Sequence, residues 1–208
     1  YFARKAVDAI VKRCGRPVER AYIELEDLLE HDEESGRSMV NREKILSYLA
    51  DPDQSVRLAV IDKATEIAAK ASNEQILPIL THRLADAEDP VEKSFLVKTI
   101  GILGSKEHVS VLIPFLKDHD SRVRADTIEA LEYIGDTSVY PAIIPLLQDG
   151  DNRVQANAAV AFRMFGGDKA LDLLEKMLGS SLVWLRDSAA FALREIKLPQ
   201  AVKLLLNF

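Results

Sequence analysis

A repeat of 31 residues is the feature that most constrains what this chain can fold into. Glycines that each follow an apolar residue recur at this spacing: Gly104, Gly135 and Gly166. Apolar residues of a second column keep it as well: Val123, Val154 and Leu185. Several columns stay in phase over about 140 residues, which a chance match of single residues would not produce. The chain is therefore predicted to be built from duplicated units.

Each unit reads as two helices. Apolar side chains recur at helical spacing across 122–134: Val123, Thr127, Ile128, Leu131 and Ile134. Asp120 or Ser121 offers an N-cap to this helix, and Gly135 offers a left-handed C-cap. The preceding connection, 117–121, is so short that the two helices must form an antiparallel pair.

The pattern extends over most of the chain, and no strand signal interrupts it. Helices are expected over 2–14, 17–30, 38–50, 53–69, 74–85, 89–103, 106–117, 120–134, 138–148, 151–165, 168–178 and 182–196, with a tail from 199. One hairpin cannot bury both of its faces, so each unit needs a neighbour. The predicted fold class is all-α: a right-handed α-solenoid of about six stacked antiparallel helix pairs. Residues 1–36 would form a capping or degenerate repeat, and 37–208 the repeats proper, with the last one truncated.

Prolines, aspartates and arginines recur in a fixed order within the units. An aspartate follows a proline by eight residues at Pro78 and Pro141, and an arginine follows an aspartate by six at Asp51 and Asp118. This order resembles HEAT repeats, including the HEAT-like variety of phycobilin lyase subunits. The resemblance covers about 38–196 and implies the fold, whereas the scaffold serves many functions. No unit keeps all three residues, and Glu92 and Gln155 stand in for the arginine: these are departures from the family's pattern.

The same residues have physical roles in such a repeat. Pro114 and Pro145 would kink the first helix of their units. An aspartate at the turn can accept hydrogen bonds from backbone donors and from an arginine that begins the second helix. We therefore interpret the arginines as a structural ladder, with an anion site as the alternative: Arg57, Arg124 and Arg186.

The sequence contains few groups of residues at spacings typical of catalytic or metal sites. None of the four histidines is followed by glutamate, which excludes the repeated His-Glu pairs of HEAT-like di-iron hydroxylases. The run 118–120, Asp-His-Asp, offers metal-ligand types, but it falls in a solvated turn and adjacent residues rarely converge on one ion. Cys14 has basic neighbours, yet it is interpreted as a small apolar residue at a helix end. We predict a protein that is not an enzyme and has no catalytic residue, cofactor or metal.

Composition and net charge limit the classes of partner and the compartment that this chain is expected to have. The net charge of −6 argues against nucleic-acid binding through a general positive field. No apolar run approaches the ~18 residues of a membrane helix. A single cysteine excludes an internal disulfide framework and suits the cytoplasm. The first residue is Tyr1 rather than Met, from which we expect a segment of a longer protein.

The second helices of stacked repeats commonly line the concave side, and the columns beside their buried stripe should face a groove. Those columns contain aromatic, arginine and apolar residues, types that anchor protein interfaces. The predicted partner-binding residues are Arg122, Tyr133, Arg153, Met164, Trp184 and Phe191. In the competing interpretation, Val160, Met164 and Phe191 pack between repeats and Trp184 caps a turn.

The leading hypothesis is a non-enzymatic scaffold or adaptor that binds a partner protein or peptide along this surface, with no small-molecule substrate. The alternatives are an enzyme subunit resembling a phycobilin lyase, which attaches a chromophore, and a nucleic-acid-binding HEAT-like protein. A separate run of seven acids over 24–34 is interpreted as solvated surface, or else as a docking site for a basic partner.

Overall fold

The computed structural model describes residues 23–31, 36–181, 183–196 and 199–207. The predicted helix 2–14, the first part of 17–30 and Cys14 lie outside this range. The chain divides into two compact units, Tyr1–Gly104 and Ser105–Phe208. The described part of each has its own buried apolar core, which we call the core of unit 1 and of unit 2.

Unit 1 contains a small antiparallel hairpin where the sequence predicts helix. A 3-10 turn, η1 (Glu26–Leu28), leads into β1 (Leu29–His31), which pairs with β2 (Ser38–Val40). Gly36 has a left-handed φ of 65°, which lets the chain turn back. The amide of Val40 donates to Gln75 Oε1 at 2.8 Å, so a helix side chain completes the strand's hydrogen bonding. The predictions of helix up to residue 30, of a helix from residue 38 and of no strands are wrong here.

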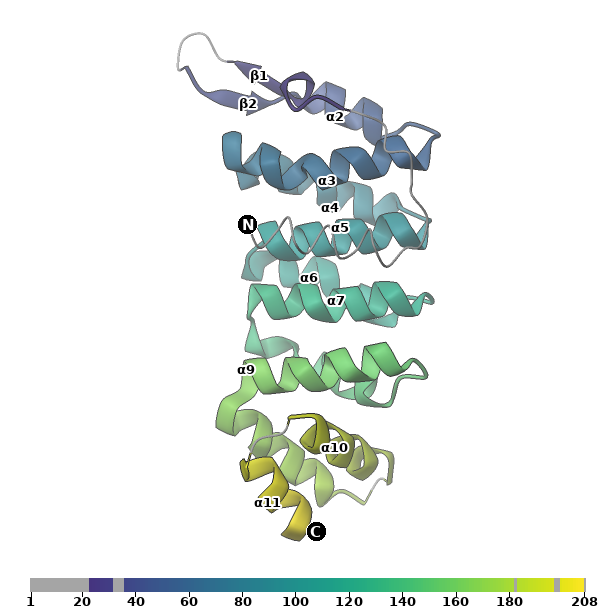
Figure 1. Ribbon diagram of the computed structural model, residues 1–208, viewed down its shortest axis with the longest axis vertical. Helices are drawn as coiled ribbons and strands as arrows, with labels where there is room; N and C mark the ends of the chain where they lie inside the picture. Colours follow the sequence, from purple (N-terminus) through teal and green to yellow (C-terminus); the bar gives the residue numbers. More distant parts are fainter. Residues whose placement is uncertain (1–22, 32–35, 182, 197–198, 208) are drawn as a thin grey trace. The chain divides into compact units, whose positions relative to one another are not determined.

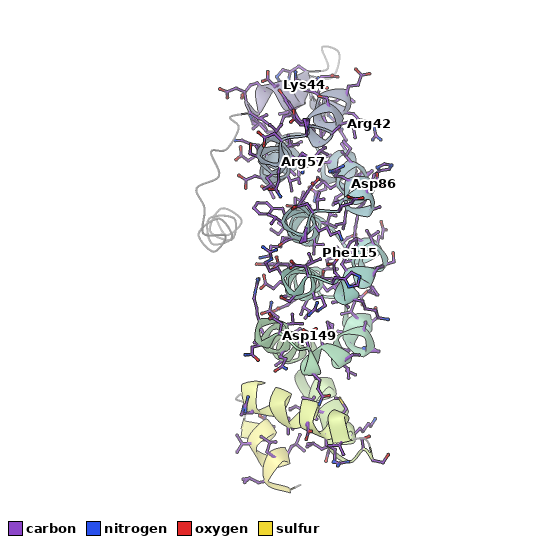
Figure 2. The ribbon with its side chains drawn as sticks, turned by 90° about the vertical axis from the view of Figure 1, so that its right-hand side faces the viewer. Arg42, Lys44, Arg57, Asp86, Phe115 and Asp149 are labelled. Atoms are coloured by element: carbon purple, nitrogen blue, oxygen red, sulfur yellow. The ribbon has the colours of Figure 1, made fainter. Side chains whose placement is uncertain are left out.

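The rest of unit 1 is helical, and the predicted helices 53–69, 74–85 and 89–103 are confirmed. The bounds are α2 (Arg42–Leu49), α3 (Gln54–Lys70), α4 (Asn73–Asp86) and α5 (Pro90–Leu103). Helix α3 packs on both α4 and α5, and their facing side chains are buried. Viewed along the helices, those of unit 1 form two columns, with Arg57 of α3 in one and Asp86 of α4 in the other (Figure 2).

Unit 2 repeats this arrangement with shorter first helices. Its elements are η2 (Lys106–His108), α6 (Val109–Leu112), η3 (Ile113–Lys117), α7 (Ser121–Ile134), η4 (Thr137–Val139), α8 (Tyr140–Ile143), η5 (Ile144–Gln148), α9 (Asn152–Leu178), α10 (Val183–Ile196) and α11 (Pro199–Asn207) (Figure 1). Helix α7 packs against η3 and α9, and α9 packs against α10. The predicted stripe of α7 is confirmed: Val123, Thr127, Ile128 and Leu131 are buried, and Ile134 is half-buried.

In unit 2 the first helices change from α-helix to 3-10 helix at the two prolines that were predicted to kink them. Helix α6 gives way to η3 at Ile113, directly before Pro114, and α8 gives way to η5 at Ile144, directly before Pro145. Proline has no amide hydrogen and its ring crowds the carbonyl four residues earlier, which disfavours regular α-helix at these places, although α4 accommodates Pro78 in its interior. The tighter 3-10 turn carries the chain into the next connection.

Helix α9 contradicts the predicted helix stop at Gly166 and Gly167. It runs unbroken from Asn152 to Leu178, so the segments predicted as 151–165 and 168–178 are one helix. Its ribbon bends part-way along its length (Figure 1). Two adjacent glycines loosen a helix and allow a bend, but neither removes a backbone hydrogen bond as proline would. By contrast, Gly135 is the left-handed C-cap that the sequence predicts, with φ 71°.

Aspartates begin the second helices at a constant place. Asp53, Asp89, Asp120 and Asp151 are the N-caps of α3, α5, α7 and α9, and each carboxylate accepts from backbone amides of the first turn. The pKa of Asp53 falls below its ordinary 3.8, mainly because of hydrogen bonds from Ser55. The pKa of Asp120 is lowered mainly by the side chain of Arg122. These caps hold the turns that join first and second helices.

The lowered pKa values predict loss of stability in acid. A carboxylate with a depressed folded-state pKa stabilises the fold above its unfolded value of 3.8, and this contribution disappears as pH falls through the folded-state pKa. We expect the urea midpoint to be level between about pH 7 and 5 and to drop below about pH 4. The double variant Asp120→Asn/Asp151→Asn keeps a capping oxygen but no titration, and should lose less. An equal midpoint at about pH 3 and 6 would contradict this expectation.

Candidate partner-binding surface

The arginines of the predicted ladder bind the turns. Arg57, Arg124 and Arg186 each donate through Nη1 to the backbone oxygen six residues earlier, at 2.7, 2.8 and 2.8 Å. Gln155 does the same through Nε2, at 2.6 Å from Asp149 O. A side chain from the second helix thus closes the turn before it in each of these repeats. This geometry favours the structural interpretation over an anion site.

Arg124 also joins neighbouring hairpins of unit 2. Its Nε and Nη2 donate to the two carboxylate oxygens of Asp149, at 2.7 and 2.6 Å, across a turn of the next repeat. Hydrogen bonding to Asp149 raises the pKa of Arg124 above its ordinary value. Burial would raise the pKa of Asp149, but the Arg124 guanidinium lowers it on balance. Planar two-point pairing of this kind fixes orientation as well as distance.

The prediction that Glu92 stands in for the ladder arginine assigns this residue to the wrong position of its repeat. It is the third residue after its N-cap Asp89, the position that Val123 and Val154 hold in later repeats. Lys93, not Glu92, therefore takes the place of the ladder arginine. The predicted substitution of arginine by Glu92 is corrected accordingly: this glutamate occupies a core position and is 1% exposed.

Two arginines neutralise that buried carboxylate. Arg57 Nε lies 2.8 Å from Glu92 Oε2, and Arg83 Nε lies 2.5 Å from Glu92 Oε1. Arg57 comes from α3 and Arg83 from α4, so Glu92 of α5 ties three helices of unit 1 together. A lone buried carboxylate is costly, whereas one with two partners is tolerated.

The second helices of unit 2 carry the predicted surface. We call the columns beside the buried apolar stripe of α7 and of the first part of α9 the α7–α9 strip. Its described members are Arg122, Asp126, Glu129 and Tyr133 of α7, and Arg153, Asn157 and Val160 of α9. The spacing of these columns follows from the shared N-cap register at Asp120 and Asp151.

A polar network connects the two helices within the α7–α9 strip. Arg153 Nη2 donates to Asp126 Oδ1 at 2.5 Å and to Glu129 Oε1 at 3.4 Å. Asn157 Nδ2 donates to the same Glu129 oxygen at 2.8 Å and to Ala125 O at 3.1 Å. Burial alone would lower the pKa of Arg153, but the charges of Asp126 and Glu129 outweigh it and raise the pKa.

Apolar side chains lie beside this network. Tyr133 is 63% exposed and Val160 is 37% exposed, although the other large apolar side chains described in α7 and α9 are buried or half-buried. Val160 follows Asn157 by three residues and Tyr133 follows Glu129 by four, so each shares a helix face with the network. Exposed apolar residues beside ordered polar ones are a common composition of binding surfaces.

The structure places some of the predicted site residues and not others. Arg122, Tyr133 and Arg153 all belong to the α7–α9 strip, with Arg122 in the first turn and Tyr133 in the last turn of α7. Arg122 is held by its own N-cap, with Nε and Nη2 on Asp120 at 3.1 and 2.9 Å. The backbones of Met164 on α9 and of Trp184 and Phe191 on α10 are helical, but their side chains lie outside the described part.

The sequence did not predict which side chains hold Arg153 in place on this surface. Asp126 pairs with Arg153 on a diagonal, 27 residues away, so comparing residues 31 apart does not reveal the pair.

Unit 1 also has half-buried apolar residues at the equivalent positions of α5: Val91, Phe95 and Ile102. The N-cap aspartates would have revealed these, because Asp89 precedes Asp120 by 31 residues.

We also searched the described residues for a metal site, a membrane-spanning helix and the acidic run noted in the sequence. No three His, Cys, Asp or Glu side chains there converge as metal ligands would. Within the same residues, no helix combines the length and apolarity needed to span a bilayer. Four members of the acidic run, Glu24, Glu26, Asp27 and Glu30, are exposed, and Asp32, Glu33 and Glu34 lie outside the description. Its role as a docking site stays a prediction.

Helix hairpins joined by a repeated aspartate cap and a repeated arginine clamp define an all-α helical-repeat protein of the α-solenoid class. The chain belongs to the HEAT repeat family. The model of that family, described as HEAT repeats, matches residues 42–132, 77–154 and 109–194. The resemblance drawn from the sequence is thereby confirmed.

Solved structures are similar to this chain, and one of them supports the shared fold. The complex of CpcE and CpcF of phycocyanin lyase from Nostoc sp. PCC7120 is 22% identical, covers 90% of this chain and 74% of its own, and has a TM-score of 0.54. A designed armadillo repeat protein in complex with the peptide (KR)4 is 20% identical over 80% of this chain and 87% of its own, with a TM-score of 0.43. An engineered protein is 22% identical over 75% and 79%, with a TM-score of 0.46. No curated protein matches the chain.

Proposed function

We propose that this chain is a non-enzymatic scaffold that binds a partner protein or peptide along the α7–α9 strip. The observation that carries the proposal is the exposure of Tyr133 on α7 and of Val160 on the neighbouring helix α9. Tyrosine offers a large contact area with few rotatable bonds, and it is enriched among the residues that dominate binding energy. The neighbouring polar network holds this surface in one geometry before a partner arrives, which reduces the entropic cost of binding.

The charges of the α7–α9 strip disfavour nucleic acid as the partner. Asp126 and Glu129 place two carboxylates beside the guanidinium of Arg153, and Asp120 neutralises the other arginine of the strip, Arg122. Phosphate recognition requires an excess of positive charge, and its strength depends on the number of phosphates neutralised. The likeness to a phycocyanin lyase complex supports the shared fold alone and does not extend that activity to this chain. A scaffold role needs no reactive residue.

The proposal predicts that removing the tyrosine ring weakens binding. The probe is a peptide selected on the intact chain from a random display library, and fluorescence anisotropy measures its Kd. We expect Tyr133→Ala to weaken binding about tenfold or more, because it removes an interface anchor. The fold should be unaffected, since Tyr133 is 63% exposed.

Ile113→Ala is the matched control, because Ile113 is also an exposed apolar residue of unit 2 but belongs to η3, in a first helix. Its Kd should stay within about twofold of the unmodified chain. Circular dichroism confirms folding of both variants. If no peptide is selected, or if Tyr133→Ala binds as well as the unmodified chain, the proposed function is wrong.

A further inference from the structure

The guanidinium of Arg153 is held at one corner only. Nη2 makes both of its side-chain hydrogen bonds, to Asp126 and Glu129. Among the described residues, no acceptor lies within hydrogen-bonding distance of Nε or Nη1. The side chain is 35% exposed, so these donors are open to a ligand while the anchored corner fixes the plane of the group. Arg122 differs, because Asp120 binds it at two points.

Asn157 offers the complementary group. Its Nδ2 donates to Ala125 O and to Glu129 Oε1, which fixes the amide in one orientation. Within the described part of the chain, nothing donates to Asn157 Oδ1. The residue is half-buried at the surface of α9, so Oδ1 is an oriented acceptor.

The donor and the acceptor lie side by side. Arg153 and Asn157 bind the same oxygen of Glu129, and they are four residues apart on α9. Side chains at this spacing share a helix face, with Cβ atoms about 5–6 Å apart. One residue of an extended chain presents its N–H and its C=O in the same direction, as in the hydrogen-bonded pairs of an antiparallel ladder. The pair therefore matches the main chain of an extended peptide.

Charge selects among ligands for these groups. Two carboxylates already face the Arg153 guanidinium, so an acidic ligand would bring a third negative charge to the cluster. A neutral peptide carbonyl can accept from Nε or Nη1 without that repulsion. Tyr133 and Val160, which flank the network, offer contact area for an apolar side chain of the same ligand.

We propose that Arg153 and Asn157 form a main-chain recognition pair for an extended, uncharged peptide segment. Arg153 donates to the carbonyl of one peptide residue, and Asn157 Oδ1 accepts from the N–H of that residue. An adjacent apolar side chain of the peptide packs against Tyr133 and Val160. This inference rests on the proposed function, and it specifies the chemistry of the partner at the α7–α9 strip.

The test modifies the ligand, so it does not depend on the stability of variants. Each amide of the display-selected peptide is N-methylated in turn, and the Kd for the intact chain is measured by anisotropy. One position should lose binding about tenfold or more when its N–H is removed, because Asn157 Oδ1 is then left without its donor. The Kd should change little between about 50 and 500 mM NaCl, because the recognised groups are uncharged.

The protein-side variant is Arg153→Lys, which keeps a positive charge for Asp126 and Glu129 but removes the fixed Nε and Nη1 donors. It should weaken the peptide about fivefold or more, whereas Arg42→Lys, an exposed arginine of α2, should not. A flat N-methyl scan, or binding that weakens steeply with salt, overturns the recognition pair. If Tyr133→Ala still weakens binding as predicted in that case, the proposed function stands and only this inference fails.

Discussion

Replacing Glu92 with alanine is expected to lower the free energy of unfolding by about 3–5 kcal/mol. The side chain is 1% exposed and accepts from Arg57 and Arg83. Its removal leaves two guanidinium groups without their carboxylate and opens a cavity between α3, α4 and α5. Both effects destabilise the folded state. The Arg57 and Arg83 side chains are 14% and 26% exposed, so water compensates for only part of the loss.

Urea unfolding followed by circular dichroism measures this change, and hydrogen exchange across α3–α5 locates it in unit 1. Glu66→Ala on α3 is the control, because Glu66 is exposed and its one ion pair within the described residues is with the nearby Lys63. It should change the free energy of unfolding by no more than about 0.5 kcal/mol. Equal effects of the two substitutions would show that Glu92 is not the junction of the three helices.

Arg124→Ala is expected to lower the free energy of unfolding by about 3 kcal/mol, because it breaks a shielded two-point ion pair and frees a turn. Arg124 is 17% exposed and Asp149 is 8% exposed, so water screens their attraction little. The same guanidinium also holds Asp118 O and His119 O. Loss of these bonds separates two hairpins as well as loosening one connection.

A double-mutant cycle with Asp149→Asn isolates the pair, and it should give a coupling of about 1–3 kcal/mol. The matched control is the Arg122–Asp120 pair, which has the same two-point geometry two residues earlier on α7. Arg122 is 51% exposed, so its coupling should be below about 1 kcal/mol. Couplings of equal size would mean that the link between hairpins contributes nothing beyond a surface ion pair.

The sequence was sufficient to predict the features that recur. Periodic apolar positions determine the helices because each unit must bury the same stripe, and Pro114 and Pro145 break their helices for a local reason. The hairpin of β1 and β2 could not be predicted, because it depends on pairing between Leu29 and Val40 and on a bond to Gln75 far along the chain. Such long-range contacts do not produce a periodic pattern in the sequence.

The sequence predicted which face of the helices carries the candidate surface, but it did not predict the hydrogen bonds and ion pairs between the side chains of that face. Column positions placed Arg122, Tyr133 and Arg153 on one side of their helices. They did not show that Asp126 and Glu129 would hold Arg153, because these partners are related by a diagonal between helices rather than by the repeat. Glu92 was misread for a similar reason, since its role follows from the helix start at Asp89.

The most direct test of the α7–α9 strip as the binding surface is a nuclear magnetic resonance titration of the intact chain with the display-selected peptide. Amide and side-chain resonances of Tyr133, Arg153, Asn157 and Val160 should shift together and saturate at one peptide per chain. Resonances of η3, including Ile113 and Phe115, should stay in place. Shifts confined to first-helix residues, with the α7–α9 strip unmoved, would contradict the proposed function.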